Sequence, residues 1–160
     1  AFVTAYKDQF GMDTRIARIF NTYGPRMRFD GIYGRALPRF IDQALNGKPI
    51  TIFGDGSQTR SFTYLTDLIE GLLKLARMDG ASGCVVNIGN DQETSVLEMA
   101  NKILNLTQSG SKMTFHPLPE DDPLRRKPII ERAREILGWE PKVSLEQGLT
   151  RTIEWYKSLK

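Results

Sequence analysis

The sequence predicts an α/β protein. Short apolar runs rich in β-branched and aromatic residues, typical of strands, alternate with longer segments whose apolar residues recur at helical spacing. Such alternation is typical of a sheet covered by helices. A length of 160 residues allows one domain with a proper core, or one domain and part of another.

The order of the expected elements follows from this alternation and from turn residues between the segments. They are a helix ending at Phe10, strands over 14–20, 50–53 and 85–89, and helices from about Pro38 to Gly47, over 67–78, over 95–106, around 133–137 and from 144 onward. Glycines close the first, second and fifth of these helices, as C-cap residues do. Turn residues at 21–26 end the first strand.

Helix starts and core aromatics are the clearest local signals. Ser95 with Glu98, and Ser144 with Gln147, have the spacing of a capping box. Thr66-Asp67 is typical of an N-cap and predicts the start of the third helix. Trp139 and Trp155 are expected in the core.

Composition excludes several functional classes. The net charge of +3 is small and spread along the chain, so no nucleic-acid partner is expected. There is no long apolar run, so neither a membrane span nor a signal peptide is expected. Cys84, the single cysteine, is expected to be a buried thiol, and the lack of a disulfide favours a cytoplasmic location. With His116 alone and no Cys/His grouping, no metal site is expected.

A glycine-rich loop over residues 54–64 follows the second strand and carries one arginine, Arg60. Gly54 and Gly56 allow the main chain to approach a ligand closely. The guanidinium of Arg60 offers a planar fork of donors that matches the oxygens of a phosphate or diphosphate. A surface turn with a solvated arginine is the alternative that this loop alone leaves open.

A second long loop, over residues 117–128, is rich in proline and charge and contains the cluster Arg125-Arg126-Lys127. A stretch of this length without regular structure is more often functional than idle in a compact domain. The chain has no G-x-G-x-x-G or G-x-x-G-x-x-G, so the phosphate-binding first turn of a Rossmann fold is absent from it. Together with a start in mid-pattern at Ala1, this predicts the carboxyl-terminal part of a longer protein.

Several segments, in order along the chain, resemble extended short-chain dehydrogenases that act on nucleotide sugars. They are residues 18–27, 40–49, 52–60, 87–90, 122–128 and 137–141. The first, Arg-Ile-Phe-Asn-Thr-Tyr-Gly-Pro-Arg-Met, and Asp-Asp-Pro-Leu-Arg-Arg-Lys-Pro in the last long loop are most similar to UDP-glucuronate decarboxylases, which make UDP-xylose. The dTDP-glucose 4,6-dehydratases and the nucleotide-sugar 4-epimerases are near relatives.

The resemblance implies a division of the chain and a reaction. Residues 1–30 would end an NAD-binding Rossmann domain, and residues 31–160 would form the small α/β domain that binds the nucleotide sugar. The cofactor would be NAD, the substrate a UDP-sugar, and the complete enzyme a homodimer. The Tyr-x-x-x-Lys pair that serves the family as catalytic base would lie upstream of Ala1, on the helix before the first strand, so this chain alone would be inactive. A non-catalytic module that binds UDP-sugars is the alternative from another functional class.

The resemblance also implies roles for individual residues. Substrate-binding roles fall on Asn21, Arg35, Leu37, Thr51, Phe53, Arg60 and Arg126, and cofactor-binding roles on Thr22, Tyr23 and Pro25. Arg60 would hold the diphosphate, and Arg126 the diphosphate or the sugar carboxylate. Thr51 and Phe53 would bracket the base. For Asn21 a bond to its own backbone, and for Arg126 simple solvation, are the alternatives.

Overall fold

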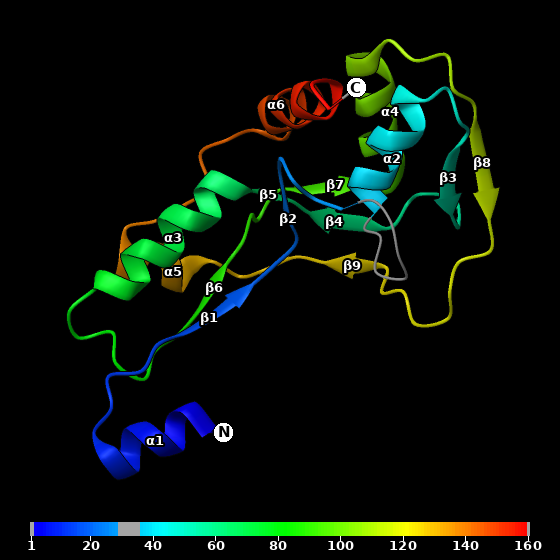
Figure 1. Ribbon diagram of the computed structural model, residues 1–160. Coiled ribbons are helices and arrows are strands. Elements are labelled where there is room, and N and C mark those ends of the chain that lie inside the picture. Colours follow the sequence, from blue (N-terminus) through cyan, green and yellow to red (C-terminus); the bar gives the residue numbers. More distant parts are fainter. Residues whose placement is uncertain (1, 29–35, 160) are drawn as a thin grey trace.

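The computed structural model describes residues 2–28 and 36–159 and confirms a mixed α/β fold (Figure 1). The helices are α1 (Phe2–Phe10), α2 (Ala36–Leu45), α3 (Leu65–Arg77), α4 (Val96–Thr107), α5 (Glu131–Leu137) and α6 (Leu145–Lys157). The strands are β1 (Ile16–Ile19), β2 (Thr22–Tyr23), β3 (Ile50–Phe53), β4 (Thr59–Ser61), β5 (Thr63–Tyr64), β6 (Val85–Ile88), β7 (Glu93–Ser95), β8 (Met113–His116) and β9 (Arg125–Arg126).

The strands pair in small groups. β1 runs parallel to β6, β2 to β5, and β3 to β8. β4 lies between β7, which is antiparallel to it, and β9, which is parallel. This last group brings together three segments that are far apart in the sequence, and it forms one wall of the site described below.

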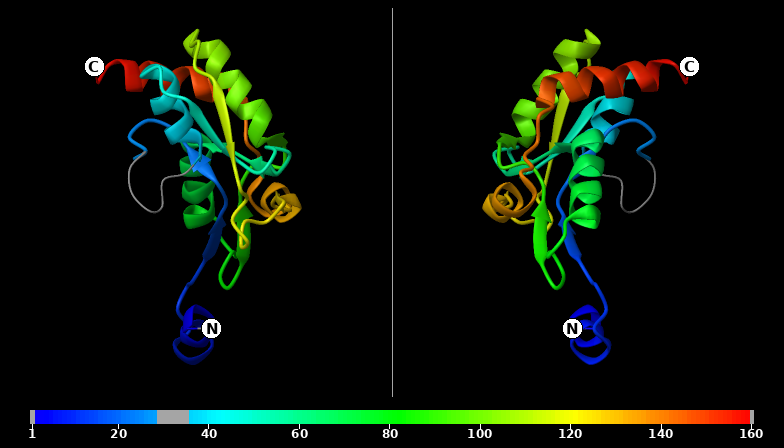
Figure 2. Two further views of the ribbon diagram at one scale, coloured as in Figure 1. Left: turned by 90° about the vertical axis from the view of Figure 1, so that its right-hand side faces the viewer. Right: turned by 90° about the vertical axis from the view of Figure 1, so that its left-hand side faces the viewer.

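Two hydrophobic cores form around separate groups of helices, one around α2, α4 and α6 and the other around α3 and α5 (Figures 1 and 2). The larger is built by α2, α4 and α6 on β3, with Tyr23 and Tyr64 from the short strands. The smaller joins α3 and α5 to β6 and consists of Leu75, Ala81, Val86, Ile88, Ile130, Ala133, Leu137 and Trp139. Ala17 of β1 packs against this smaller core. The division of the chain into domains at residue 30 stays a prediction.

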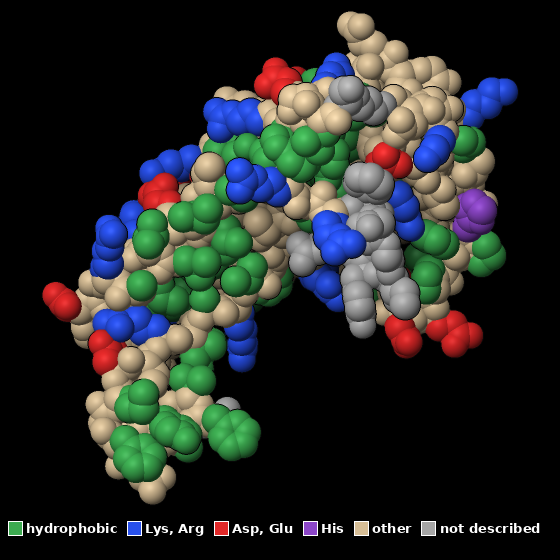
Figure 3. Space-filling model, viewed as in Figure 1, with side chains coloured by type: hydrophobic (Ala, Val, Ile, Leu, Met, Phe, Trp, Pro, Cys, Tyr) green, Lys and Arg blue, Asp and Glu red, His purple; other side chains and the backbone are tan. Residues whose placement is uncertain are grey.

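α1 stands apart from both cores. It protrudes at the amino-terminal end of the molecule (Figure 2), and none of its described residues is buried. Phe2 is 84% exposed and Phe10 62% exposed, and apolar side chains gather over this helix (Figure 3). Among the described residues, no helix combines the length and the apolar character that crossing a membrane requires.

Both predicted capping boxes are confirmed. The Ser95 side chain accepts a hydrogen bond from the Glu98 backbone N–H, and the Glu98 carboxylate accepts one from the Ser95 N–H. Ser144 and Gln147 make the same reciprocal pair at the start of α6. Each pair satisfies two donors that a helix start leaves open, so both helix starts are fixed locally.

The predicted cap of α3 is wrong. The helix begins at Leu65, and its N-cap residue, Tyr64, makes no side-chain capping bond. Asp67 is buried instead, and its carboxylate accepts hydrogen bonds from the backbone N–H groups of Lys142 at 3.0 Å and Val143 at 2.9 Å. A carboxylate can satisfy the donors of any nearby segment, so here it joins α3 to the chain that leads into α6.

Trp139, Trp155 and Cys84 were all predicted to be buried, and the structure buries only Trp139 completely. Trp139 is fully buried, and its Nε1 donates to the Asp67 carbonyl at 3.0 Å. Trp155 is partly buried and packs against the larger core. Cys84 is only partly buried, so the expected buried thiol is wrong. It directly precedes β6 and packs against the smaller core.

Candidate functional site

A hollow of about 280 Å³ lies where β2, the start of α2, β4 and β9 meet. Its lining residues are Asn21, Thr22, Tyr23, Met27, Ala36, Leu37, Arg60, Phe62 and Arg126. Most of the residues assigned to the site from the sequence are therefore gathered in one place, although they come from four separate segments. Met27, Ala36 and Phe62 line it as well, and as apolar residues they could not be recognised in the sequence as parts of a site.

The β4–β9 pairing sets the two arginines beside each other. Arg60 and Arg126 are direct partners in the parallel register of these strands. Because alternate side chains of a strand point to opposite faces, paired residues share a face. The two guanidinium groups therefore serve the same hollow, and their combined positive charge suits an anion with several oxygens. The sequence predicted a loop over residues 54–64. That prediction is wrong at the end of the segment, where β4 carries Arg60 and β5 follows.

The Arg60 side chain is 11% exposed and held at both ends of its guanidinium. One terminal nitrogen donates to the Thr59 carbonyl at 2.7 Å, and the other to Oδ1 of Asp122 at 2.5 Å. The Asp122 carboxylate comes from the long loop before β9. A phosphate that binds Arg60 would meet this carboxylate, and the guanidinium has five donors with which to serve both.

Asn21 and Thr22 lie where the chain passes from β1 into β2. The Asn21 carbonyl accepts a hydrogen bond from the Thr63 N–H at 2.9 Å, which fixes the segment against β5. The Thr22 hydroxyl donates to the Phe20 carbonyl at 3.0 Å. Both side chains line the hollow at the carboxyl end of a parallel strand, the edge at which open α/β sheets bind ligands.

Tyr23 forms the floor of the site and belongs to the larger core. Its ring packs edge-on against Tyr64, with ring centroids 5.5 Å apart, and its hydroxyl donates to the Leu145 carbonyl at 3.2 Å. Burial raises the pKa of the Tyr23 phenol well above its usual value. Tyr23 therefore stays neutral at physiological pH and supports the site by packing.

A second hollow of about 380 Å³ adjoins the first, since Thr22, Tyr23 and Met27 line both. Pro25, Gly24, Arg28 and Leu65 complete it. A Cβ atom at Gly24 would lie 2.2 Å from Leu65 Cδ2, so only glycine leaves this turn its shape. The three residues assigned to NAD thus line one wall, and they fit contact with one end of a dinucleotide.

Thr51 and Phe53 do not line either hollow. The Thr51 hydroxyl accepts from Nε2 of Gln43 at 2.8 Å, and its N–H donates to Oε1 of the same side chain at 3.1 Å. The Arg39 guanidinium lies 5.2 Å from the centroid of the Phe53 ring. The predicted bracketing of a base by Thr51 and Phe53 stays a prediction. Arg35 lies outside the described residues.

Arg39 is a candidate that sequence reasoning missed. Its Nε is buried without a hydrogen-bond partner among the described residues, and burial lowers the pKa of its guanidinium. Half-buried and stacked on Phe53, it presents donors beside the residues assigned to the base. In the sequence it is one polar residue on an amphipathic helix, so nothing there distinguishes it from a solvated arginine.

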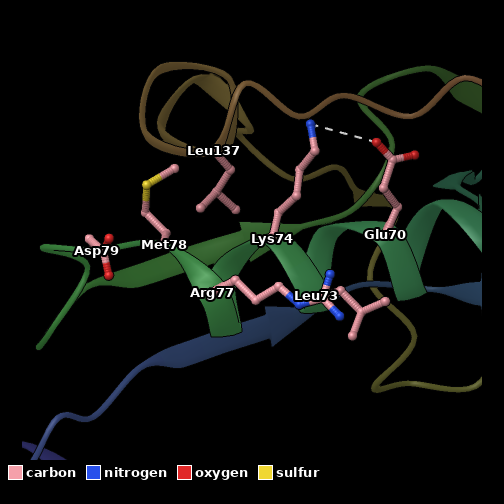
Figure 4. A pocket seen from close by; sticks show the side chains of 7 residues that line it. All are labelled: Glu70, Leu73, Lys74, Arg77, Met78, Asp79 and Leu137. Atoms are coloured by element: carbon pink, nitrogen blue, oxygen red, sulfur yellow. Dashed lines mark ion pairs between the residues drawn. The ribbon is translucent and has the colours of Figure 1, made fainter.

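A larger hollow of about 480 Å³ lies elsewhere, between α3 and α5 (Figure 4). It is lined by Glu70, Leu73, Lys74, Arg77, Met78, Asp79 and Leu137, none of which is a predicted site residue. Lys74 donates to the Gly138 carbonyl at 2.8 Å and lies 3.6 Å from Glu70, which also pairs with Lys142 at 3.2 Å. Its central polar groups pair with one another, so the smaller hollow is the better candidate. Within the described part of the chain, no group of three or more His, Cys, Asp or Glu is placed to hold a metal ion.

The fold and the site define a class of protein. Residues 1–89 match the model of the NAD dependent epimerase/dehydratase family. This match covers more than half of the 160 residues, and the chain belongs to that family.

Two curated relatives are decarboxylases. UDP-glucuronic acid decarboxylase 1 of Xenopus tropicalis is 46% identical over 96% of this chain, which covers 35% of that protein. UDP-glucuronic acid decarboxylase 4 of Arabidopsis thaliana is 47% identical over 91% of this chain, which covers 32% of that protein. The chain thus spans about a third of the length of these relatives.

Solved structures of epimerases share the fold. An epimerase from Methanothermobacter thermautotrophicus superposes with a TM-score of 0.93 at 34% identity, covering 98% of this chain and 47% of its own. UDP-glucuronic acid 4-epimerase from Bacillus cereus, solved with UDP-glucuronic acid and NAD, superposes with a TM-score of 0.90 at 33% identity, covering 99% of this chain and 49% of its own.

Proposed function

We propose that this chain is the carboxyl-terminal part of an NAD-dependent UDP-glucuronate decarboxylase that makes UDP-xylose. The observation that carries the proposal is the pairing of Arg60 with Arg126 across β4 and β9, in a hollow that Asn21 and Thr22 complete. The identity of 46% to a decarboxylase over nearly the whole chain supports the choice of reaction.

In the proposed site, Arg60 and Arg126 bind the diphosphate of the substrate. Charge-assisted hydrogen bonds of this kind contribute about 1.5–3 kcal/mol each. Asn21 hydrogen-bonds the sugar or its phosphates, and Leu37 packs beside them. Arg35, Thr51 and Phe53 keep their assigned contacts with the phosphates and the base, and Arg39 joins them through its place over Phe53.

Thr22, Tyr23 and Pro25 would hold part of NAD, which would supply the oxidation at C4 of the sugar and the reduction that follows the loss of carbon dioxide from C5. The ketone at C4 is β to the C5 carboxylate, so it can take up the electron pair that the departing carbon dioxide leaves behind. The role of this chain is to hold the diphosphate and so to place the sugar for both hydride steps. The catalytic Tyr-x-x-x-Lys pair would come from the rest of a full-length protein, which we propose to be a cytoplasmic homodimer without a nucleic-acid partner.

A second candidate is a UDP-glucuronate 4-epimerase. The specific observation that favours it is the similarity to the Bacillus cereus enzyme, whose structure contains UDP-glucuronic acid and NAD. Both reactions begin with oxidation at C4, so a site that binds the diphosphate serves either one. They differ in whether the carboxylate is lost before the hydride returns.

Product analysis separates the two. The full-length protein is incubated with UDP-glucuronate and NAD, and the nucleotide products and carbon dioxide are measured. We expect UDP-xylose and carbon dioxide in equal amounts. UDP-galacturonate without carbon dioxide would instead identify the epimerase. Dehydration of dTDP-glucose, or binding of UDP without any turnover, would contradict the decarboxylase assignment.

A further inference from the structure

Glu93, on β7, lies at the centre of a hydrogen-bonded cluster beside the two arginines of the site. Its Oε1 accepts from the Thr59 hydroxyl at 2.7 Å and from Nε of Arg125 at 2.8 Å, and its Oε2 accepts from Nη2 of Arg125 at 2.5 Å. A single carboxylate thereby takes donors from both β4 and β9. We name Glu93, Thr59 and Arg125 the carboxylate clamp.

The strand registers place the clamp on the face of the sheet opposite to the site. On β4, Thr59 and Ser61 alternate with Arg60, so their side chains point away from that of Arg60. Glu93 is paired with Ser61 and Arg125 with Thr59, whereas Arg126 is paired with Arg60. The clamp therefore touches the strands that carry the two arginines without sharing the hollow that a ligand would enter.

β9 needs such a connection because it is two residues long and lies at the edge of its sheet. Backbone contacts with β4 are correspondingly few; they include the Thr59 N–H donating to the Leu124 carbonyl at 2.9 Å. The bidentate contact of Arg125 with Glu93 is a charge-assisted bond of fixed geometry. Hydrogen bonds from Arg125 and Thr59 lower the pKa of Glu93 to about 2, so its charge is present at neutral pH.

We propose that Glu93 is a positioning residue: through Arg125 it holds β9 against β4 and so sets the spacing of Arg126 from Arg60 to fit a diphosphate. This inference rests on the proposed function, because it assigns a purpose to the spacing of the same two arginines. It also gives neighbouring arginines of one basic cluster different tasks. Arg125 binds the carboxylate within the protein, and Arg126 binds the ligand.

The test is a double-mutant cycle on UDP binding in the full-length protein, measured by calorimetry. Glu93→Gln keeps the shape of the side chain but removes the charge that fixes Arg125. We expect UDP to bind about three- to fivefold more weakly, as suits an ion pair that is partly open to solvent. In the background of Arg126→Ala, the same change is expected to have no further effect, since the residue it positions is gone.

Arg125→Ala provides an independent variant, since its side chain is 68% exposed and its removal leaves no cavity. It is expected to weaken UDP binding to the same extent, and it replaces Glu93→Gln in the cycle if that variant does not fold. Glu98→Ala is the matched control: it removes a carboxylate that is close in sequence to Glu93 and that accepts a hydrogen bond from the Ser95 N–H in the capping box of α4. It is expected to lower the melting temperature and to leave UDP affinity unchanged.

The outcomes separate the two proposals. If UDP does not bind, or if Arg126→Ala leaves its affinity unchanged, both the proposed function and the positioning role are overturned. If Arg126→Ala weakens binding while Glu93→Gln has no effect, the positioning role alone is overturned. An equal effect of Glu93→Gln with and without Arg126 would also overturn it, because the effect would then not pass through Arg126.

Discussion

The guanidinium of Arg60 lies in the hollow, with its charge set against the Asp122 carboxylate at 2.5 Å. In the sequence it follows Gly54 and Gly56 within one polar segment, and in the structure it lies on β4. Because only 11% of the side chain is exposed, its orientation is fixed before a ligand arrives. A preorganised donor costs less ordering entropy on binding than a mobile one.

Replacing Arg60 by alanine is expected to raise the KM of the full-length enzyme for its nucleotide sugar by about one to two orders of magnitude, from the loss of about 1.5–3 kcal/mol. Steady-state kinetics with UDP-glucuronate measure the change. Arg77→Ala is the control, since Arg77 lines the separate hollow beside α3 and contacts none of the site residues. An unchanged KM in Arg60→Ala, or an equal rise in both variants, would rule out the role given to Arg60.

Contacts between residues that are far apart in the chain could not be predicted from the sequence. Asp122 and Glu93 stand far from Arg60 and Arg125 along the chain, and only the assembled strands bring them into contact. A carboxylate in a polar loop has no local feature that distinguishes pairing from solvation. Arg39 could not be predicted for the same reason, since its guanidinium lies over the ring of Phe53, which belongs to another element.

At the scale of elements, local signals determined the helices and failed for the short strands. Capping boxes and C-cap glycines are patterns of a few residues close together in the chain. The starts of α4 and α6 could therefore be predicted to within a residue or two. β4, β5, β7 and β9 are two or three residues long. At that length no alternation of apolar and polar residues can develop, and the pairing partners alone make them strands. β8, although four residues long, was also missed, and it forms by pairing with β3.

α6 packs closely against Tyr23 of the site and against Tyr64 at one residue, Gly148. A Cβ atom at Gly148 would lie 2.0 Å from the Tyr23 hydroxyl oxygen and 2.8 Å from Cδ2 of Tyr64. Both rings are buried and packed edge-on, so they have little room to withdraw. The close approach of α6 to the floor of the hollow therefore requires glycine at this position.

Gly148→Ala is expected to lower the free energy of unfolding by about 1–3 kcal/mol, because overpacking outweighs the gain in helix propensity. Denaturant titration measures the change. Gly110→Ala is the matched control: nothing lies within 4 Å of the added Cβ, and the expected change is within about 0.5 kcal/mol. Equal stability of the two variants would contradict the tight packing of α6 on Tyr23.

At the scale of the whole molecule, the hollow is assembled from chain segments around residues 21–27, 36–37, 60–62 and 126. The motifs in the sequence predicted part of this lining, namely Asn21, Thr22, Tyr23, Leu37, Arg60 and Arg126, and the α/β class followed from periodicity. The place where these segments meet could not be predicted, because it depends on two cores that are built from interleaved parts of the chain. Thr51 and Phe53 lie outside the hollow for this reason: β3 pairs with β8, in a different group from β4.

The central claim is that Arg60 and Arg126, neighbours across β4 and β9, grip a diphosphate between them. A crystal structure of the full-length protein with UDP tests it most directly. The account predicts phosphate oxygens within hydrogen-bond distance of both guanidinium groups, with the uracil directed toward Phe53. UDP bound elsewhere, or both side chains turned into solvent with nothing between them, would contradict it.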